Sequence, residues 1–483
     1  MELKTTTAII AGCAALSAGD AVTAETPPPN IIFILADDAG IADFGCYGGK
    51  IIHTPNIDKL AAEGMKFTNH YSGSTVCAPS RCCLMTGKHT GHATVRGNAK
   101  NTISESDVTV AQILKKNDYA TAIIGKWGLG NTPGGEGDPN KHGFDLFFGF
   151  REQGHAHHYY PDYLWRNGTK LEFPDNPTKR TKYSHDLFTK EALDFIENNK
   201  KKPFFLYLAY TIPHSDLDVP KDSMAPYIGK LDPEKPYKGK AKHGFPAVPQ
   251  STPHAAYAGM ISRMDRDVGR IIQLLDKLGI SKNTIVFFSS DNGPSKAGGA
   301  DPKFFDSNGP HRGIKRDLYE GGVRCPFIVK WPAAIKPGTT TDHLSAFWDF
   351  LPTIAEIAKQ PIPEGTDGIS YLPTLLGKTS EQKAHKALYW EFYEKGGKQA
   401  IRIGDWKLVR LNISKDPDAT PELYNLAKDP GETKNVAAEH PETLKKLIDA
   451  MRTAHAPTDK YSWTKTKTGK KKKGKKKSKD KKK

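Results

Sequence analysis

The chain has 483 residues, enough for one large domain and a smaller one, and its 37% hydrophobic residues are ordinary for a globular protein. The formal net charge is +16, but residues 465–483 hold thirteen lysines and one aspartate, so the rest of the chain is close to neutral. The basic excess therefore does not indicate a nucleic-acid-binding protein, because it belongs to one terminal segment.

Residues 1–24 are typical of a signal peptide. Lys4 supplies a positive start, Thr7–Leu16 is mildly apolar, and Val22-Thr23-Ala24 ends like a small-residue cleavage site. We therefore expect a secreted or periplasmic protein. A lipoprotein modified at Cys13 is the less favoured alternative, because the preceding apolar run is short. No later segment has the roughly 20 apolar residues that a transmembrane helix needs.

Residues 25–375 alternate between buried-strand and helical patterns. Strands are predicted at Ile31–Leu35, Ala120–Ile124, Phe204–Leu208, Thr284–Ser289 and Pro326–Val329. Helices are predicted at Ile57–Glu63, Val108–Lys116, His185–Asn198 and Tyr257–Leu278. Continuous apolar strands are covered on both faces, so this alternation predicts an α/β fold, a mainly parallel sheet sandwiched by helices.

Polar side chains follow two of these strands directly. Asp37 and Asp38 come after the first strand, and Asp291 and Asn292 come after the strand that begins at Thr284. Open α/β sheets place their ligands beyond the carboxyl ends of the strands. An oxygen-only set of carboxylates and an amide favours Ca²⁺ or Mg²⁺ over Zn²⁺. Either segment alone also fits an ordinary turn, and the pair together favours a site.

The pattern changes after residue 375. Short antiparallel strands are predicted at Ala387–Glu391, Gln399–Ile403 and Trp406–Leu411, followed by an amphipathic helix at Glu439–Ala454. We interpret residues 376–462 as a small α+β subdomain. The Lys-rich tail, 463–483, is predicted to be disordered. It fits either a solvated segment with no partner or one that contacts anionic polymers or the cell envelope.

The motif that carries most information is Cys77-Ala78-Pro79-Ser80-Arg81, followed by Thr86-Gly87. It resembles the formylglycine recognition motif of type I sulfatases, which belong to the alkaline phosphatase superfamily. Further segments resemble family motifs in family order: Asp37-Asp38, Gly125-Lys126-Trp127, Pro213-His214, Asp291-Asn292-Gly293, Arg312-Gly313-x-Lys315, Tyr319-Glu320-Gly321-Gly322 and Glu422-Leu423-Tyr424-Asn425-Leu426. The resemblance spans about residues 28–455 and extends to polysaccharide-degrading bacterial sulfatases.

The resemblance implies that a maturation enzyme oxidises Cys77 to formylglycine (3-oxoalanine). A hydroxyl of the hydrated aldehyde then attacks sulfur, and the other hydroxyl later expels sulfate as the aldehyde re-forms. One Ca²⁺ ion is implied, which would position the sulfate and stabilise negative charge. Its expected ligands are Asp37, Asp38, Cys77 in its oxidised form, Asp291 and Asn292.

Four further residues receive expected roles. Arg81 lies four residues after Cys77, about one helical turn away, where its fork can hold the nucleophile or an anionic oxygen. By resemblance, Lys126 and Lys315 bind sulfate oxygens from opposite sides. His214 is the expected general acid for the leaving sugar alkoxide, because imidazole titrates near neutral pH. By resemblance, it shares this work with Lys315.

One position departs from the family pattern. The Gly-Lys-Trp-His-Leu-Gly element has Gly128 where the family has a histidine that contacts the formylglycine hydroxyl. We hypothesise that His157, in the His-rich segment 153–161, fills this role. The segment also fits substrate binding or loop packing. Together with the long loop Leu217–Pro253, it is a candidate for substrate selection, with His158, Tyr160 and Trp165 as candidate sugar contacts.

These expectations define a hydrolase of sulfate esters, acting on O-sulfated sugars of a polysaccharide or glycosaminoglycan. Family analogy favours galactose or N-acetylgalactosamine units. Two alternatives remain open at this point: a phosphoester or phosphonate hydrolase of the same superfamily, and a non-catalytic protein that binds sulfated glycans.

Overall fold

The computed structural model describes residues 27–99, 101–241 and 247–463. The predicted signal peptide and cleavage site lie outside the described residues, as does the Lys-rich tail apart from Trp463. Among the helices of the described ranges, none is both long and apolar enough to cross a membrane.

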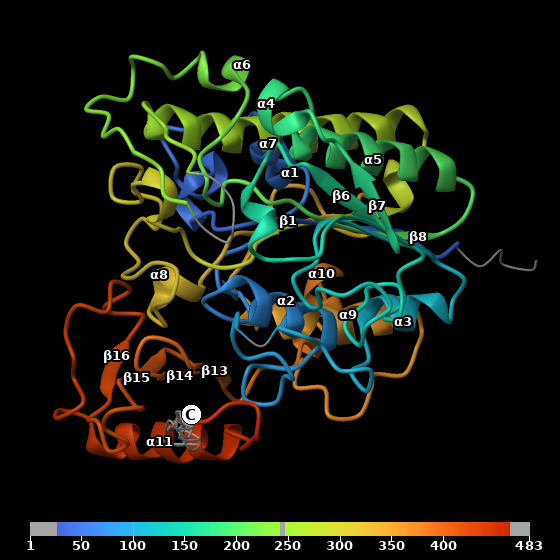
Figure 1. Cartoon of the computed structure of the whole chain (residues 1–483). Coiled ribbons are helices and arrows are strands. Elements are labelled where there is room, and N and C mark those ends of the chain that lie inside the picture. Colours follow the sequence, from blue (N-terminus) through green and yellow to red (C-terminus); the bar gives the residue numbers. More distant parts are fainter. Residues whose placement is uncertain (1–26, 100, 242–246, 464–483) are drawn as a thin grey trace, which may run out of the picture.

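The larger part of the fold is a ten-stranded sheet in the order β11-β2-β10-β9-β1-β8-β4-β5-β6-β7 (Figure 1). The central strands β9, β1, β8, β4 and β5 are parallel, and β10 and β6 run antiparallel to their neighbours. The strands are β1 (Asn30–Ala36), β2 (Met65–Phe67), β4 (Ala120–Lys126), β5 (Leu146–Phe150), β6 (Tyr163–Arg166), β7 (Thr169–Glu172), β8 (Phe204–Ala209), β9 (Thr284–Ser290), β10 (Phe327–Lys330) and β11 (Thr339–Thr341). A separate two-stranded sheet pairs β3 (His70–Tyr71) with β12 (Ser345–Ala346).

Helices cover both faces of this sheet, as Figure 1 shows. One layer contains α1 (Pro55–Ala62), α4 (Asn176–Lys179), α5 (Ser184–Asn199), α6 (Lys221–Met224) and α7 (Pro253–Lys277). The other contains α2 (Cys77–Thr86), α3 (Val110–Lys115), α9 (Phe350–Ile357) and α10 (Leu372–Leu375), with the short α8 (Glu320–Val323) nearer the C-terminal subdomain. Short 3-10 helices occur at Ile41–Asp43, Gly45–Tyr47, His155–His157, Ser281–Asn283, Ala297–Gly299, Phe347–Asp349 and Thr379–Glu381.

The alternation of side chains along β1 explains the two layers. Ile31, Phe33 and Leu35 join the core on the α2 and α9 side, whereas Ile32 and Ile34 join the core on the α5 and α7 side. A strand buried on both faces must be apolar throughout, which is why it appears in the sequence as a continuous apolar run. The predicted α/β sandwich with a mainly parallel sheet is confirmed.

The chain ends in a small antiparallel sheet with a helix on one face, drawn in red in Figure 1. Its strands are β13 (Leu388–Phe392), β14 (Lys398–Ile403), β15 (Trp406–Leu411) and β16 (Glu422–Asn425), and its helix is α11 (Pro441–Ala454). Leu447 and Met451 of α11 pack on Ile401 and Leu408 of the sheet. The expected α+β subdomain is therefore present, and its division from the main domain at residue 375 stays a prediction.

Candidate active site

The first group of candidate residues meets where two neighbouring strands end. Asp37 and Asp38 follow β1, and Asp291 and Asn292 follow β9, its parallel neighbour in the sheet. The Asp38 amide donates to Asp291 Oδ1 at 3.1 Å, and Asn292 Nδ2 donates to Asp38 Oδ1 at 2.8 Å. Asp38 has a φ of 68°, which turns the chain sharply after the strand. The structure brings the four oxygen-bearing side chains together, and all are buried.

Cys77 is the first residue of α2 and faces this cluster. Its Sγ lies 3.3 Å from Asp37 Oδ1 and 4.0 Å from Asp38 Oδ1, and Lys315 Nζ lies 3.4 Å from it. Burial and the charge of Asp37 raise the pKa of the Cys77 thiol to about 12. The unmodified thiol is therefore protonated near neutral pH and is a poor nucleophile in this site.

Arg81 lies one turn further along α2 and is completely buried. Its Nε and Nη2 donate to Asp291 Oδ2 at 3.1 and 2.9 Å, and Nη2 is 3.4 Å from Asp37 Oδ2. Its Nη1 donates to the carbonyl oxygen of Lys126 at 2.8 Å. In this structure the guanidinium therefore holds two of the acidic residues in place. The expected contact of Arg81 with the nucleophile stays a prediction.

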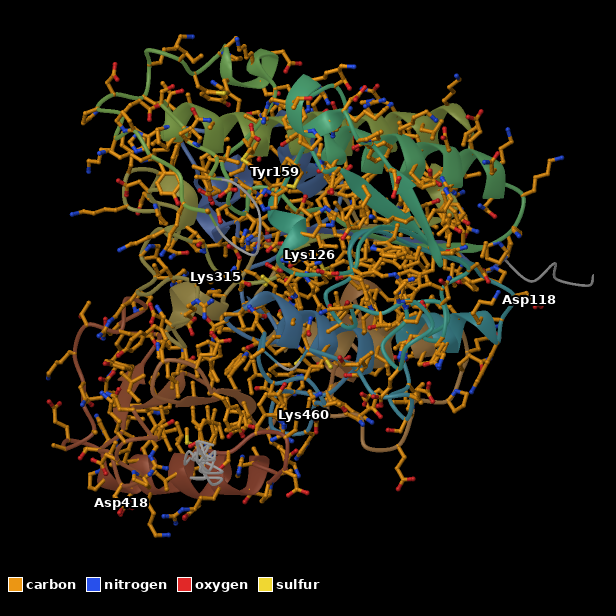
Figure 2. The ribbon with its side chains drawn as sticks, in the orientation of Figure 1. Asp118, Lys126, Tyr159, Lys315, Asp418 and Lys460 are labelled. Carbon is orange, nitrogen blue, oxygen red and sulfur yellow. The ribbon has the colours of Figure 1, made fainter. Side chains whose placement is uncertain are left out.

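Three cationic or ionisable side chains complete the cluster. Lys126 Nζ donates to Asp37 Oδ2 at 2.6 Å, and Lys315 Nζ donates to both oxygens of Asp38 at 2.7 Å. His214 Nε2 lies 3.3 Å from Asp38 Oδ2. Figure 2 shows Lys126 and Lys315 near one another and far from Asp118, which precedes β4 at the opposite end of the sheet. The site thus occupies the carboxyl ends of the parallel strands.

The pKa values reflect this crowding of charges. Burial alone would raise the pKa of Asp37, but Lys126, His214 and Arg81 hold it well below its usual value. Burial and the negative charge of Asp37 raise the pKa of Asp291 to about 7. Burial lowers the pKa of His214 to about 4 against the opposing effect of Asp38. Carboxylates and cations alternate around one point, which suits binding of a metal cation and an anionic substrate together.

The donor set fits a hard divalent cation. Ligand atoms of Asp37, Asp38, Cys77 and His214 all lie within 4.8 Å of one another. Asn292 Oδ1 is buried and has no hydrogen-bond partner, whereas buried side-chain oxygens ordinarily have one. A cation would satisfy this oxygen and the neighbouring carboxylates, and oxygen ligands of this kind are those that Ca²⁺ and Mg²⁺ prefer.

His157 lies beside the general-acid candidate. Its ring stacks on that of His214, with centroids 4.3 Å apart and planes at 26°. Burial, and next the charge of His214, lower the pKa of His157 well below its usual value. The structure therefore brings this predicted residue to the site.

Sequence analysis did not identify Gln153, which lies beside Gly128, the position that departs from the family pattern. Gly128 has a φ of 73°, and a Cβ on it would lie 2.5 Å from Gln153 Nε2 and 3.9 Å from Arg81 Cδ. The Gln153 side chain thus occupies the space beside Gly128 that a larger residue there would need. Nothing in the local sequence distinguishes Gln153, because residues 128 and 153 meet only through the packing of two loops.

The candidate sugar-contacting residues fall into two groups. His158 and Tyr160 line a cavity of about 170 Å³ together with Arg180. One wall of this cavity contacts the segment that carries His214, because Tyr159 donates to the carbonyl oxygen of His214 at 2.6 Å. Trp165 instead lies on β6 and packs against the main core.

Comparisons with known proteins agree with this geometry. Residues 29–360 match the family described as Sulfatase, and residues 311–456 match the family described as N-sulphoglucosamine sulphohydrolase, C-terminal. The chain is 32% identical to an N-acetylgalactosamine-6-O-sulfatase of Bacteroides thetaiotaomicron, over 88% of this chain and 92% of that protein. It is 30% identical to an N-acetylgalactosamine-6-sulfatase of Homo sapiens, over 88% and 85% of the two chains.

Comparison with solved structures also gives matches over most of the chain. The structure described as Ps i-CgsB in complex with k-i-k-neocarrahexaose has a TM-score of 0.74 and 30% identity, covering 88% of this chain and 92% of that one. A phosphonate monoester hydrolase of Agrobacterium radiobacter, at 19% identity and a TM-score of 0.66, shares the fold. The chain therefore belongs to the sulfatase family, within the alkaline-phosphatase-like superfamily, and is a sulfuric ester hydrolase.

Proposed function

We propose that this sulfatase is secreted or periplasmic and removes O-linked sulfate from sugars of a polysaccharide or glycosaminoglycan, with N-acetylgalactosamine or galactose units as the first candidates. The similarity to N-acetylgalactosamine-6-sulfatases supports the choice of sugar. The observation that carries the proposal is the position of Cys77 Sγ, within 4 Å of Asp37, Asp38 and Lys315.

The proposed nucleophile is formylglycine made from Cys77 by a maturation enzyme. The protonated, buried thiol supports this, because it is unsuited to attack on sulfur in its unmodified form. When present and hydrated, the aldehyde supplies one hydroxyl for attack and a second whose deprotonation releases sulfate. Arg81 keeps Asp291 and Asp37 aligned around this position.

The proposed metal is one Ca²⁺ ion held by Asp37, Asp38, Asp291, Asn292 and the oxidised residue 77. When bound, the ion would supply positive charge beside a sulfate oxygen and would help to orient the ester. Lys126 and Lys315, which flank the acidic pair from two sides, would hold the remaining sulfate oxygens. His214 would donate a proton to the leaving sugar oxygen, and Lys315 would support it. Burial lowers the pKa of His214 to about 4, so this role requires the negative charge of the bound ester to raise that pKa again.

The test is sulfate release from a panel of sulfated saccharides, with the protein produced together with a formylglycine-generating enzyme. We expect release by the wild type, no release by Cys77→Ala, and a peptide mass that shows the aldehyde at residue 77. Phosphate release from matched phosphoesters, without sulfate release, would favour a phosphoester or phosphonate hydrolase. Confirmed aldehyde with no turnover of any ester would contradict the proposed chemistry.

Removal of the metal is expected to abolish sulfate release and to lower the melting temperature. A ligand at a hundred times its Kd stabilises a folded protein by about 2.7 kcal/mol, so loss of a bound ion is visible without an activity assay. EGTA followed by added Ca²⁺ should remove and restore both properties. Full activity and unchanged melting in metal-free protein, verified by elemental analysis, would contradict the proposed site.

His157→Ala is expected to lower kcat by about 10²-fold, the usual loss when a group that transfers protons is removed. The stacking of its ring on His214 supports a role in catalysis. The matched control is His158→Ala, which removes a neighbouring histidine that lines the adjacent cavity and should act mainly on KM. Little change in kcat for His157→Ala would exclude this role and make Gln153 the next candidate.

A further inference from the structure

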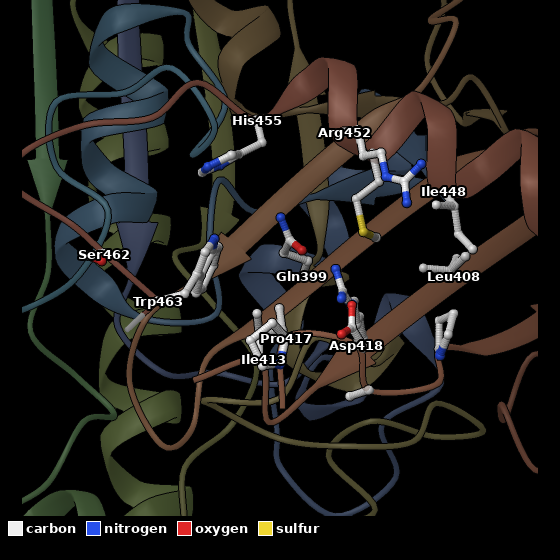
Figure 3. A pocket seen from close by; sticks show the side chains of 14 residues that line it. Gln399, Leu408, Ile413, Pro417, Asp418, Ile448, Arg452, His455, Ser462 and Trp463 are labelled. Atoms are coloured by element: carbon white, nitrogen blue, oxygen red, sulfur yellow. The ribbon is translucent and has the colours of Figure 1, made fainter. Parts of the chain in front are cut away.

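A cavity of about 530 Å³ lies in the C-terminal subdomain, between the β14–β15 hairpin and the C-terminal end of α11 (Figure 3). Its volume falls in the usual range for small-molecule sites. None of the proposed catalytic or metal-binding residues lines it. It is therefore separate from the site described above.

The cavity exists because one face of the small sheet changes from apolar to polar along its length. Antiparallel register sets Ile401 opposite Leu408, and Gln399 opposite Arg410 two pairs further on. Side chains two residues apart point to the same face, so both pairs face α11. The helix packs on the apolar pair, and the polar pair borders the cavity.

The charged groups around the cavity favour an anion. Arg410 lines it, and none of the ion pairs found within the described ranges includes Arg410. Arg452 of α11 also borders it, but its side chain is 77% exposed and lies 3.5 Å from Asp449, so Arg410 is the main positive group. Asp418 is the one carboxylate among the described lining residues. Arginine forks bind sulfate and related oxyanions with two parallel hydrogen bonds.

The remaining walls favour a sugar ring. Trp463 lines the cavity, as Figure 3 shows, and its indole is fixed by stacking on Tyr393, with centroids 4.0 Å apart and planes at 10°. Leu408, Ile413 and Met451 form an apolar floor. An aromatic wall, an apolar floor and a few polar groups match the amphipathic faces of a pyranose.

We propose that this cavity is a second saccharide-binding site, which holds a sulfated sugar unit of the polymer away from the catalytic centre. The choice of ligand class rests on the proposed function. The alternative occupant within this chain is the Lys-rich segment that follows Trp463 in the sequence. Arg410 opposes it, because like charges repel.

The first test is calorimetric titration of the full chain carrying Cys77→Ala, so that ligand is not consumed. The probes are a sulfated tetrasaccharide from chondroitin sulfate and its chemically desulfated counterpart. We expect two binding sites for the sulfated probe. When Arg410→Gln and Trp463→Ala are added to this protein, the affinity of one of the two sites should fall by about tenfold or more. This is the effect of losing one charge-assisted hydrogen bond and a stacking contact.

The matched control is Lys428→Gln, which removes an exposed charge of the same subdomain outside the cavity and should leave both sites intact. In the active enzyme, the Arg410→Gln, Trp463→Ala variant should keep its kcat on a sulfated monosaccharide, which cannot reach both sites at once. Its KM for polymer should rise about fivefold, because remote binding energy is lost. Unchanged melting temperatures verify that the variants fold.

Several outcomes would overturn the inference. These are a single site in the Cys77→Ala protein, two sites unaffected by the Arg410 and Trp463 changes, or equal affinity for the desulfated probe. A second site that appears only after deletion of residues 464–483 would identify the chain's own tail as the occupant. Absence of sulfate release from every sulfated saccharide would contradict the proposed function, whereas the titration tests the cavity independently.

Discussion

Replacing Arg81 by methionine is expected to destabilise the protein by about 3–5 kcal/mol and to abolish sulfate release, because breaking a buried ion pair leaves uncompensated charge. Arg81 donates two hydrogen bonds to Asp291 and lies 3.4 Å from Asp37, and all three side chains are buried. Without the guanidinium, repulsion between these carboxylates would displace the loops that follow β1 and β9. The measurement is the urea midpoint together with sulfate release.

The control for Arg81→Met is Arg166→Met. Arg166 pairs with Glu191, but its side chain is 42% exposed. Exposed pairs contribute about 0–1 kcal/mol, so this variant should unfold near the wild-type midpoint. Arg81→Lys keeps the positive charge but loses the two-pronged hydrogen bonding of the guanidinium. We expect its stability to lie between those of Arg81→Met and the wild type, with little activity. A stable, active Arg81→Met protein would show that the metal and Lys126 position the acidic residues without it.

Four of the five central parallel strands (β9, β1, β8 and β4) could be predicted from the sequence, whereas the fifth, β5, and the edge strands could not. Strands such as β1 and β9 are buried on both faces, which leaves an unbroken apolar run. By contrast, β7 has the sequence Thr-Lys-Leu-Glu and is mostly exposed, and β2 is only three residues long. Their pairing is decided by neighbours in the sheet, so their own residues carry little signal.

The residues of the candidate site likewise include some that the sequence predicts and some that it does not. Asp37, Asp38, Asp291 and Asn292 directly follow predicted strands, so parallel topology alone places them at one edge of the sheet. The contact of Gln153 with Gly128 was not predictable, because it depends on how two loops pack and follows no periodicity. The buried ion network of Glu320, Lys407 and Glu432 was also not predicted. Glu320 belongs to the main domain, whereas Lys407 and Glu432 belong to the C-terminal subdomain.

This ion network leads to the second prediction, a large loss of stability when Lys407 is replaced. Lys407 is fully buried, with its Nζ 2.9 Å from Glu320 Oε1 and 3.1 Å from Glu432 Oε1. Glu432 Oε2 also accepts a hydrogen bond from the Glu320 amide at 2.7 Å. Glu320 immediately precedes Gly321 and Gly322, whose backbone lies against Gly293 beside the proposed metal ligands. Lys407 therefore links the C-terminal subdomain to the segment that supports the site.

Lys407→Met is expected to destabilise the protein by about 3–5 kcal/mol, because it leaves two carboxylates buried side by side. Adding Glu432→Gln removes one of those charges and should restore part of the loss. Lys434→Met, which breaks a pair with a 70% exposed lysine, should change stability by only about 0–1 kcal/mol. Urea midpoints of the four proteins measure these differences.

The same network predicts how this loss depends on pH. Burial raises the pKa of Glu432 to about 7 from its unfolded value of 4.5, against the opposing charge of Lys407. A carboxyl whose pKa is raised by folding binds more protons in the folded state, so its contribution to stability falls as pH rises between these two values. Without Lys407 the folded pKa rises further, so the penalty of Lys407→Met should be larger at pH 8 than at pH 6. A penalty independent of pH, unrelieved by Glu432→Gln, would mean that Lys407 acts through packing of its apolar stem rather than through its charge.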